Sequence, residues 1–291
     1  MFEGAMPALI TPFTKDDRVD REGLRKNIEF AEAGGVSGIV PCGTTGESAT
    51  LSAAEHEEVI DIAVDCANVP VLAGTGSNNT GEALQFTKHA ADAGVDGALL
   101  ISPYYNKPNP AGLVAHFKTI AEAVDIPIVL YNVPSRTGQD MPVEVITELA
   151  KVENIVGIKE ASGSLAKASL ILENTVDEDF IVLSGDDGLT LPIMSVGGSG
   201  VISVAANIVP DKMSGMVNAA LKGDYETARK FHYEVAALIR ALFLETNPIP
   251  VKKAAELAGL ASGQVRLPLA PLADSNSEKL AEELRKLGVL K

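Results

Sequence analysis

Cysteine, histidine and aromatic side chains are scarce in this sequence of 291 residues, and tryptophan is absent. The two cysteines, Cys42 and Cys66, could form at most one disulfide, and neither lies in a Cys-X-X-Cys pair. The four histidines are scattered along the chain without the spacing of a zinc site. We therefore expect no structural or catalytic metal.

Long apolar runs and basic charge are missing as well. No run approaches the ~18 residues of a membrane span, and the start of the chain does not resemble a secretory signal. Asp and Glu number 39 against 24 Lys and Arg, which gives a net charge of −15. An acidic surface repels nucleic acid and anionic lipid, so we expect neither as a partner. These features predict a globular protein of the cytoplasm.

The sequence does contain a repeated alternation of short apolar runs and amphipathic stretches of helical period. The predicted strands are Ala5–Thr11, Gly38–Cys42, Pro70–Gly74, Gly97–Ser102, Ile126–Asn132, Ile155–Glu160, Phe180–Ser184 and Gly200–Ser203. Because these runs are apolar throughout, we expect strands buried on both faces, as in a parallel sheet. About eight such units in roughly 220 residues favour an α/β fold, a closed (β/α)8 TIM barrel, over an open doubly wound sheet.

The predicted helices fall between these strands and continue beyond them. Those between the strands are Glu22–Ala33, Ala53–Ala67, Gly81–Ala93, Ala111–Val124, Val143–Lys151, Leu165–Glu173 and Leu189–Val196. After roughly Asp211 the strand pattern stops, and further helices are predicted at Asn218–Leu244, Val251–Leu260 and Ser277–Leu287. We accordingly expect a barrel domain over residues 1–222 and a C-terminal helical region over residues 223–291.

In a barrel of this kind the chemistry belongs at the carboxyl ends of the strands, and Lys159 lies at such an end. A lysine there could extend its amine to solvent or pair with Glu160. It could instead form an imine with a carbonyl substrate, which requires a neutral amine. Burial inside a barrel would favour the neutral amine, because a low-dielectric interior penalises the ammonium. A penalty of about 4 kcal/mol lowers the pKa of the amine by three units.

Other polar residues follow neighbouring strands. Tyr131 could be a packing residue, or its phenol could move protons beside an imine-forming lysine. Thr44 could hydrogen-bond that phenol, and the turn Gly43–Glu47 offers hydroxyl and N–H groups suited to a small carboxylate. Arg136 could be an ordinary surface residue, or its guanidinium could bind a second carboxylate through two parallel N–H···O bonds.

Two glycine-rich segments resemble nucleotide- or phosphate-binding motifs but do not match them fully. Gly74–Asn79 follows a strand, but Asn79 stands where a dinucleotide-binding motif needs glycine. Gly197–Gly200 is similar to a barrel phosphate-binding loop, yet it precedes its strand and has no adjacent Lys or Arg. A tight turn into the strand is the favoured interpretation, and we expect no cofactor.

Five motifs, in this order along the chain, resemble a known superfamily. They are Gly43–Thr50 (GTTGESAT), Tyr131–Gly138 (YNVPSRTG), Ile155–Ala161 (IVGIKEA), Ser184–Asp187 (SGDD) and Asn247–Lys252 (NPIPVK). The chain is similar along essentially its whole length to the pyruvate-dependent class I aldolases and lyases, which include N-acetylneuraminate lyase. Within this superfamily it most resembles the dihydrodipicolinate synthase family.

That resemblance implies a lyase that condenses pyruvate with L-aspartate-4-semialdehyde in the diaminopimelate route to lysine. It implies a Schiff base at Lys159 and acid–base catalysis by Tyr131. Thr44 would link Tyr131 to Tyr105 of a neighbouring subunit, which requires at least a dimer; the family is typically a homotetramer of two tight dimers. Substrate would be held by Thr45, which binds the pyruvate carboxylate, Arg136, which binds the semialdehyde carboxylate, and the backbones of Gly185 and Ile202.

Alternatives remain at this stage. Lyases of sugar acids share the lysine and tyrosine motifs but usually lack the Ser-Arg-Thr run that contains Arg136. A 2-keto-3-deoxygluconate or 4-hydroxy-2-oxoglutarate type of aldolase is the second interpretation. A non-catalytic barrel that binds a small carboxylate is the third, although such a protein has no need of an imine-forming lysine.

The resemblance also implies a site where lysine binds as an effector, at the tight-dimer interface. The matching positions are Ser48, Ala49, His56, Asn78, Glu82 and Tyr104. Ala53 departs from the pattern, because some lysine-sensitive members carry histidine there. His56 and Glu82 could equally be solvated residues on helix faces.

Overall fold

The computed structural model describes residues 2–290 and contains a parallel sheet of seven strands within that range. The strands are β1 (Gly4–Pro7), β2 (Leu72–Gly74), β3 (Gly97–Ile101), β4 (Ile128–Asn132), β5 (Ile155–Glu160), β6 (Ile181–Ser184) and β7 (Gly200–Ser203). Their order is β1-β7-β6-β5-β4-β3-β2, so each central strand pairs with its neighbours in sequence.

The predicted strand Gly38–Cys42 closes the sheet into a ring. Val40 pairs with Ala8 just beyond β1, and Ile39 pairs with Val71 just before β2, both in parallel. β1 and β2 are the two ends of the strand order, so this segment fills the position between them. The contacts are isolated bridges rather than a continuous ladder. The predicted (β/α)8 TIM barrel is confirmed.

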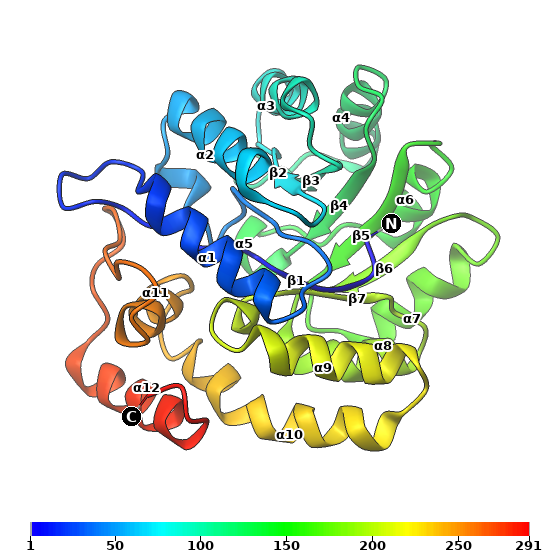
Figure 1. Ribbon diagram of the computed structural model, residues 1–291. Helices are drawn as coiled ribbons and strands as arrows, with labels where there is room; N and C mark the ends of the chain where they lie inside the picture. The colour runs from blue at the N-terminus through cyan, green and yellow to red at the C-terminus, as the bar shows by residue number, and fades with distance from the viewer. Residues whose placement is uncertain (1, 291) are drawn as a thin grey trace.

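Helices surround this ring, as Figure 1 shows. Those of the barrel are α1 (Arg21–Ala33), α2 (Ala53–Cys66), α3 (Thr80–Ala93), α4 (Pro110–Ala121), α6 (Val143–Leu149), α7 (Leu165–Asn174), α8 (Thr190–Ser195) and α9 (Pro210–Leu221). A short helix, α5 (Pro134–Thr137), follows β4, and three 3-10 turns lie at Ser48–Thr50, Asp187–Leu189 and Ala205–Asn207 in the described chain. Ser52 and Glu55 form the reciprocal capping box at the start of α2.

The core confirms that the strands are buried on both sides. One cluster fills the inside of the ring and includes Met6, Leu99, Val129 and Leu183. Separate clusters join the outer faces of the strands to the surrounding helices. Burial on both faces explains why the strands are apolar throughout instead of alternating.

The prediction of a single helix over Asn218–Leu244 is wrong. The segment contains the end of α9 and the whole of a second helix, α10 (Tyr225–Ala241). Gly223 adopts a φ of 77° between them, and the Asp224 carboxylate caps α10 by accepting from the Thr227 N–H. A left-handed glycine followed by an N-cap residue ends one helix and begins the next.

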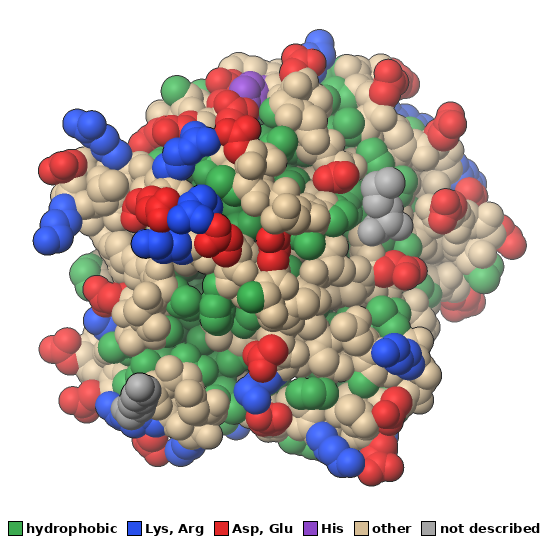
Figure 2. All heavy atoms as spheres, in the orientation of Figure 1, with side chains coloured by type: hydrophobic (Ala, Val, Ile, Leu, Met, Phe, Trp, Pro, Cys, Tyr) green, Lys and Arg blue, Asp and Glu red, His purple; other side chains and the backbone are tan. Residues whose placement is uncertain are grey.

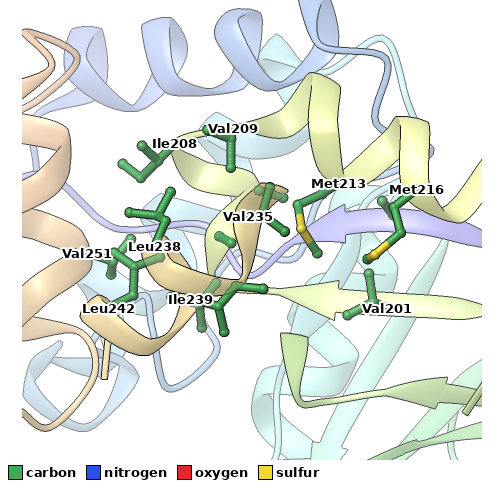
Figure 3. Close-up of a cluster of buried hydrophobic side chains, with 14 of the residues drawn as sticks. Val201, Ile208, Val209, Met213, Met216, Val235, Leu238, Ile239, Leu242 and Val251 are labelled. Atoms are coloured by element: carbon green, nitrogen blue, oxygen red, sulfur yellow. The ribbon is translucent and has the colours of Figure 1, made fainter. Parts of the chain in front are cut away.

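The C-terminal helices α10, α11 (Ile249–Leu257) and α12 (Asp274–Lys286) pack on the barrel through one continuous apolar cluster. Figure 3 shows side chains from β7, α9, α10 and α11 meeting in it, among them Val201, Met213, Leu238 and Val251. The cluster crosses the expected boundary between residues 222 and 223. The division into two parts at that boundary stays a prediction.

A buried ion pair also fastens the C-terminal region to the barrel. Lys252 on α11 lies 2.5 Å from the Glu47 carboxylate, and both side chains are almost inaccessible to solvent. The Lys252 ammonium also donates to the Thr11 carbonyl at 2.9 Å and lies 4.1 Å above the Phe13 ring. The second Glu47 oxygen accepts from the Arg266 N–H at 3.0 Å. Both members of the ion pair therefore have further hydrogen-bond partners in the protein.

Charges on the surface are mixed in sign. Figure 2 shows acidic and basic side chains interspersed on one face, with apolar groups between them. No helix in residues 2–290 combines the length and the apolar character needed to cross a membrane.

We predict that Lys252→Met destabilises the fold by about 3–5 kcal/mol, because it leaves the Glu47 carboxylate buried without its partner. Chemical denaturation measures the change. Lys230→Met is the matched control, since Lys230 pairs with Glu226 on the exposed surface of α10, and we expect no measurable change from it. Equal stability of the two variants would contradict this account of the buried pair.

Candidate active site

Lys159 and Tyr131 lie side by side at the carboxyl ends of β5 and β4. The strand register pairs them directly. The Lys159 Nζ atom is 4.2 Å from the centre of the Tyr131 ring. The next residues along each strand, Glu160 and Asn132, hydrogen-bond to each other at 3.0 Å. The carboxylate of Glu160 is thus engaged by Asn132, and Lys159 remains beside Tyr131.

Burial dominates the electrostatics of this pair. Lys159 is only 7% exposed, so its side chain is largely removed from solvent. Burial lowers the pKa of Lys159 to about 8 from its ordinary 10.5; the Asp187 carboxylate opposes this shift and the Arg136 guanidinium adds to it. Burial raises the pKa of the Tyr131 phenol, while Arg136 and a hydrogen bond with the Thr44 side chain act against that rise. Burial therefore favours the neutral amine and the protonated phenol, side by side.

The turn that carries Thr44 and Thr45 is held at both ends by unusual backbone conformations. Cys42 and Glu47 have φ values of 55° and 56°, which are rare for residues other than glycine. The buried partners of Glu47 hold it in that conformation, and the Thr11 hydroxyl donates to the Gly46 carbonyl at 2.7 Å. Strained residues of this kind persist only where the surroundings over-determine them.

Asn247, which precedes α11, contacts the site from the C-terminal region. Its side-chain N–H donates to the Thr45 hydroxyl at 2.9 Å, and its backbone carbonyl accepts from the Arg136 guanidinium at 3.0 Å. The Thr45 oxygen thereby accepts one hydrogen bond, and its own proton can be donated elsewhere. One residue of the C-terminal region thus positions two predicted substrate-binding groups.

These side chains enclose a cavity of about 490 Å³ at the mouth of the barrel. It is lined by Thr44, Thr45, Tyr131, Val133, Ser135, Arg136, Lys159, Ala161, Gly185, Asp186, Val204, Phe243, Glu245, Thr246 and Asn247. Gly185 lies against the lysine, since a Cβ atom there would be 3.0 Å from the Lys159 Cε. The cavity holds two cationic and two anionic side chains among its described lining residues.

Two predicted site residues are not among those that line this cavity in the single chain. Ile202 is buried in the cluster inside the ring and does not line the cavity. Tyr105 is 88% exposed in the loop between β3 and α4, with a φ of 70°. The expected roles of both residues stay predictions.

The residues of the predicted effector site gather around a second cavity of about 460 Å³. Ser48, Ala49, His56, Glu82 and Tyr104 line it, while Asn78 only donates to the Tyr104 carbonyl at 3.1 Å. Thr44, Tyr131 and Arg136 line both cavities. Burial lowers the pKa of His56 to about 4, so its ring is neutral at physiological pH. Binding of lysine in this cavity stays a prediction.

The sequence reasoning assigned no role to several residues at this site. Asn247 had a usable signal, because it begins a motif that supported the resemblance. Phe243, Glu245 and Thr246 had none. Asp187 stands in the SGDD motif, and its carboxylate accepts from the N–H groups of Val204 and Ala205, both at 3.0 Å. Within residues 2–290 no group of His, Cys, Asp and Glu side chains is arranged to hold a metal ion.

Comparison with known proteins decides the family. A profile of the dihydrodipicolinate synthetase family matches residues 1–287. The chain belongs to this family. It is 86% identical, over the whole of both chains, to a protein from Methanosarcina mazei named 4-hydroxy-tetrahydrodipicolinate synthase.

Solved structures of dihydrodipicolinate synthases have the same fold. A chloride-inhibited enzyme from Acinetobacter baumannii, complexed with pyruvate, has 43% identity and a TM-score of 0.97 over all of both chains. An enzyme from Cyanidioschyzon merolae with lysine bound has 41% identity and a TM-score of 0.94 over 99% of each chain. The family name thus accords with a buried lysine at the mouth of a barrel.

We predict that pyruvate adduct formation at Lys159 increases up to a pH of about 8 and then levels off. Since the pKa of Lys159 is lowered to about 8, about one amine in ten is neutral at pH 7, against about one in three thousand for an ordinary lysine. Timed borohydride quenches followed by intact mass give the initial rate at each pH. A rate that continues to rise towards pH 10 would show that the amine is not perturbed.

Proposed function

We propose that the chain condenses pyruvate with L-aspartate-4-semialdehyde to 4-hydroxy-tetrahydrodipicolinate, the first committed step of lysine biosynthesis through diaminopimelate. The observation that carries this proposal is the buried Lys159 amine beside Tyr131 and Thr44. A carbonyl-attacking lysine needs a lowered pKa and a nearby proton donor, and this arrangement supplies both. The names of the relatives support the same reaction.

The chemistry begins with attack of the neutral Lys159 nitrogen on the keto carbon of pyruvate. Tyr131 donates a proton to the developing oxygen, and loss of water leaves an iminium. Transfer of a methyl proton to the Tyr131 phenolate then gives an enamine. The enamine carbon bonds to the aldehyde carbon of the second substrate, and the aldehyde oxygen takes up a proton to become the hydroxyl of the product. After the ammonium of the semialdehyde loses a proton, its nitrogen attacks the former keto carbon, which closes the ring and releases Lys159. The other products are one water and one proton.

The remaining groups hold the substrates and relay protons. Thr45 binds the pyruvate carboxylate through the hydroxyl proton that its contact with Asn247 leaves available. Arg136 binds the semialdehyde carboxylate, and the Gly185 backbone borders the reacting centre. The Ile202 backbone would approach that centre from the buried cluster that also contains Tyr131. Thr44 connects Tyr131 to the partner subunit's Tyr105. The exposure of Tyr105 in the single chain supports such a contact, and we infer a cytoplasmic homotetramer of two tight dimers.

The alternative functions fit the cavity less well. A polyol acid of the 2-keto-3-deoxygluconate type needs neutral donors at the position where Arg136 borders the cavity. A pure carboxylate binder would gain nothing from burying an amine, which is costly unless the neutral form is used. Both observations favour the condensation.

We predict that Lys159→Ala lowers turnover by about three orders of magnitude or more, because the imine cannot form. A coupled assay with pyruvate, aspartate semialdehyde and a reductase reads turnover as NADPH consumption. Treatment with pyruvate and borohydride should add one pyruvate-derived mass to the native chain and none to the variant. The control Lys118→Ala alters an exposed lysine paired with Glu148 and should keep both signals. Turnover by Lys159→Ala near the native level would refute the imine route.

We also propose that lysine inhibits the enzyme by binding in the second cavity at the tight-dimer interface. Glu82 would pair with the effector's ammonium, beside the neutral His56 ring and Tyr104. Inhibition could reach the active site because the two cavities share Thr44 and Tyr131. We expect turnover to fall at millimolar lysine, and Glu82→Gln to shift the inhibition to higher concentration. A flat activity curve up to millimolar lysine would disprove this regulation.

A further inference from the structure

The carboxyl ends of β4 and β5 are joined by a side-chain contact outside the cavities. Asn132 and Glu160 are the last residues of the two strands, and the Asn132 side-chain N–H donates to the Glu160 carboxylate at 3.0 Å. Both residues are buried, and neither is among the described residues that line the two cavities. Since successive side chains of a strand point to opposite faces, this contact lies on the face opposite to Tyr131 and Lys159.

The Asn132 amide makes every hydrogen bond that its side-chain nitrogen can donate. Its second N–H donates to the Asp140 carboxylate at 2.8 Å, and its oxygen accepts from the Met141 N–H at 3.0 Å. The Glu160 carboxylate is equally engaged, because its other oxygen accepts from the Ser162 N–H at 2.7 Å. One buried amide therefore joins the ends of β4 and β5 to the segment between α5 and α6.

The register between β4 and β5 gives this contact a specific role. The register shifts by one residue after Ile128, which pairs with Ile155. Continued from that pair without the shift, the ladder would set Ile158, not Lys159, opposite Tyr131. A slip of one residue also turns each side chain of a strand to the opposite face. The pairing at the start of the two strands therefore does not by itself bring the lysine to the tyrosine.

The same amide closes the loop that carries Arg136. The chain leaves Asn132, forms α5 and returns at Asp140 and Met141, where the two further hydrogen bonds of the amide are made. From outside, the Lys167 ammonium pairs with the Asp140 carboxylate and donates to the Met141 carbonyl at 2.6 Å. Asn132 therefore supports the loop of Arg136 in addition to the two strands.

We propose that Asn132 is a positioning residue for the reaction. Through its hydrogen bond to Glu160 it keeps the reacting lysine opposite the phenol of Tyr131. Through its hydrogen bonds to residues 140–141 it holds the loop from which Arg136 binds the second substrate. This inference rests on the proposed function, and it assigns no contact with substrate to Asn132 or Glu160.

The first variants of the test alter each partner alone. Asn132→Asp keeps the shape of the side chain but sets a carboxylate against those of Asp140 and Glu160, so both donated hydrogen bonds are lost. We expect kcat in the coupled assay, and the rate at which borohydride traps the pyruvate adduct, to fall about 10- to 100-fold, as for a misplacement near 1 Å. KM for aspartate semialdehyde should rise, because the loop of Arg136 is less firmly held. Glu160→Gln can accept only one of its two hydrogen bonds, so it should lower both rates by a smaller factor and leave this KM unchanged.

The double variant Asn132→Asp/Glu160→Gln restores the cross-strand hydrogen bond in the reverse direction. The introduced amide nitrogen donates to the introduced carboxylate, and the amide oxygen accepts from the Ser162 N–H. The second oxygen of that carboxylate accepts from the Met141 N–H, so only the hydrogen bond to Asp140 stays lost. We therefore expect both rates to recover at least tenfold relative to Asn132→Asp.

Asn154→Asp is the matched control at the opposite end of β5. Asn154 directly precedes that strand, and its side-chain nitrogen donates to the carbonyls of Ala121 and Val124 at 2.9 and 3.0 Å. The same amide-to-carboxylate change there should lower the stability measured by chemical denaturation but leave both rates and the KM unchanged. A purely structural role of Asn132 would give its variant this same pattern.

The outcomes separate this inference from the function on which it rests. Native protein that traps pyruvate without turnover of aspartate semialdehyde would refute the proposed condensation, and the trapping rates would still test the placement of Lys159. An unchanged trapping rate in Asn132→Asp, or a double variant that does not recover, would overturn the inference. If Asn132→Asp does not fold, native rates in Glu160→Gln would overturn it. Rates lowered as far in Asn154→Asp as in Asn132→Asp would do so as well.

Discussion

Burial of the Lys159 amine inside a closed parallel barrel is the constraint on which the rest of the site depends. The register of β4 against β5 sets the lysine beside Tyr131, with apolar side chains filling the ring beneath them. Such surroundings penalise the ammonium and so produce the neutral nucleophile. The same surroundings penalise every other charge at the barrel mouth. Arg136, Asp186 and Glu245 each have a hydrogen-bond partner in the protein, which offsets part of that penalty.

The C-terminal segment supplies several of those partners, so the active site is not a property of the barrel alone. Asn247 engages Thr45 and Arg136, and Lys252 engages Glu47 in the same turn that carries Thr44. The left-handed backbone at Glu47 would be unfavourable in isolation. Its buried ion pair and the Arg266 N–H hold it, and the turn presents its two threonines in a defined place. The chain beyond the barrel thus contributes positioning as well as stability.

Much of this arrangement could be predicted from the sequence because it follows local rules. Apolar runs predicted the barrel, and the strand-end rule selected Lys159, Tyr131 and the turn around Thr44. The contact of Thr45 with Asn247 could not be found this way, since the two residues are 202 positions apart. The turn at Gly223 was missed because the amphipathic pattern continues through it. The role of Tyr105 depends on a second chain, which no property of one sequence can position.

The arrangement of charge around the cavity separates its two tasks. Lys159 reacts and Arg136 binds, and the guanidinium also contributes to lowering the pKa of the lysine. The buried Asp187 opposes that shift, so the amine is perturbed to about 8 rather than further. A second substrate that is both cation and anion suits a site with charges of both signs.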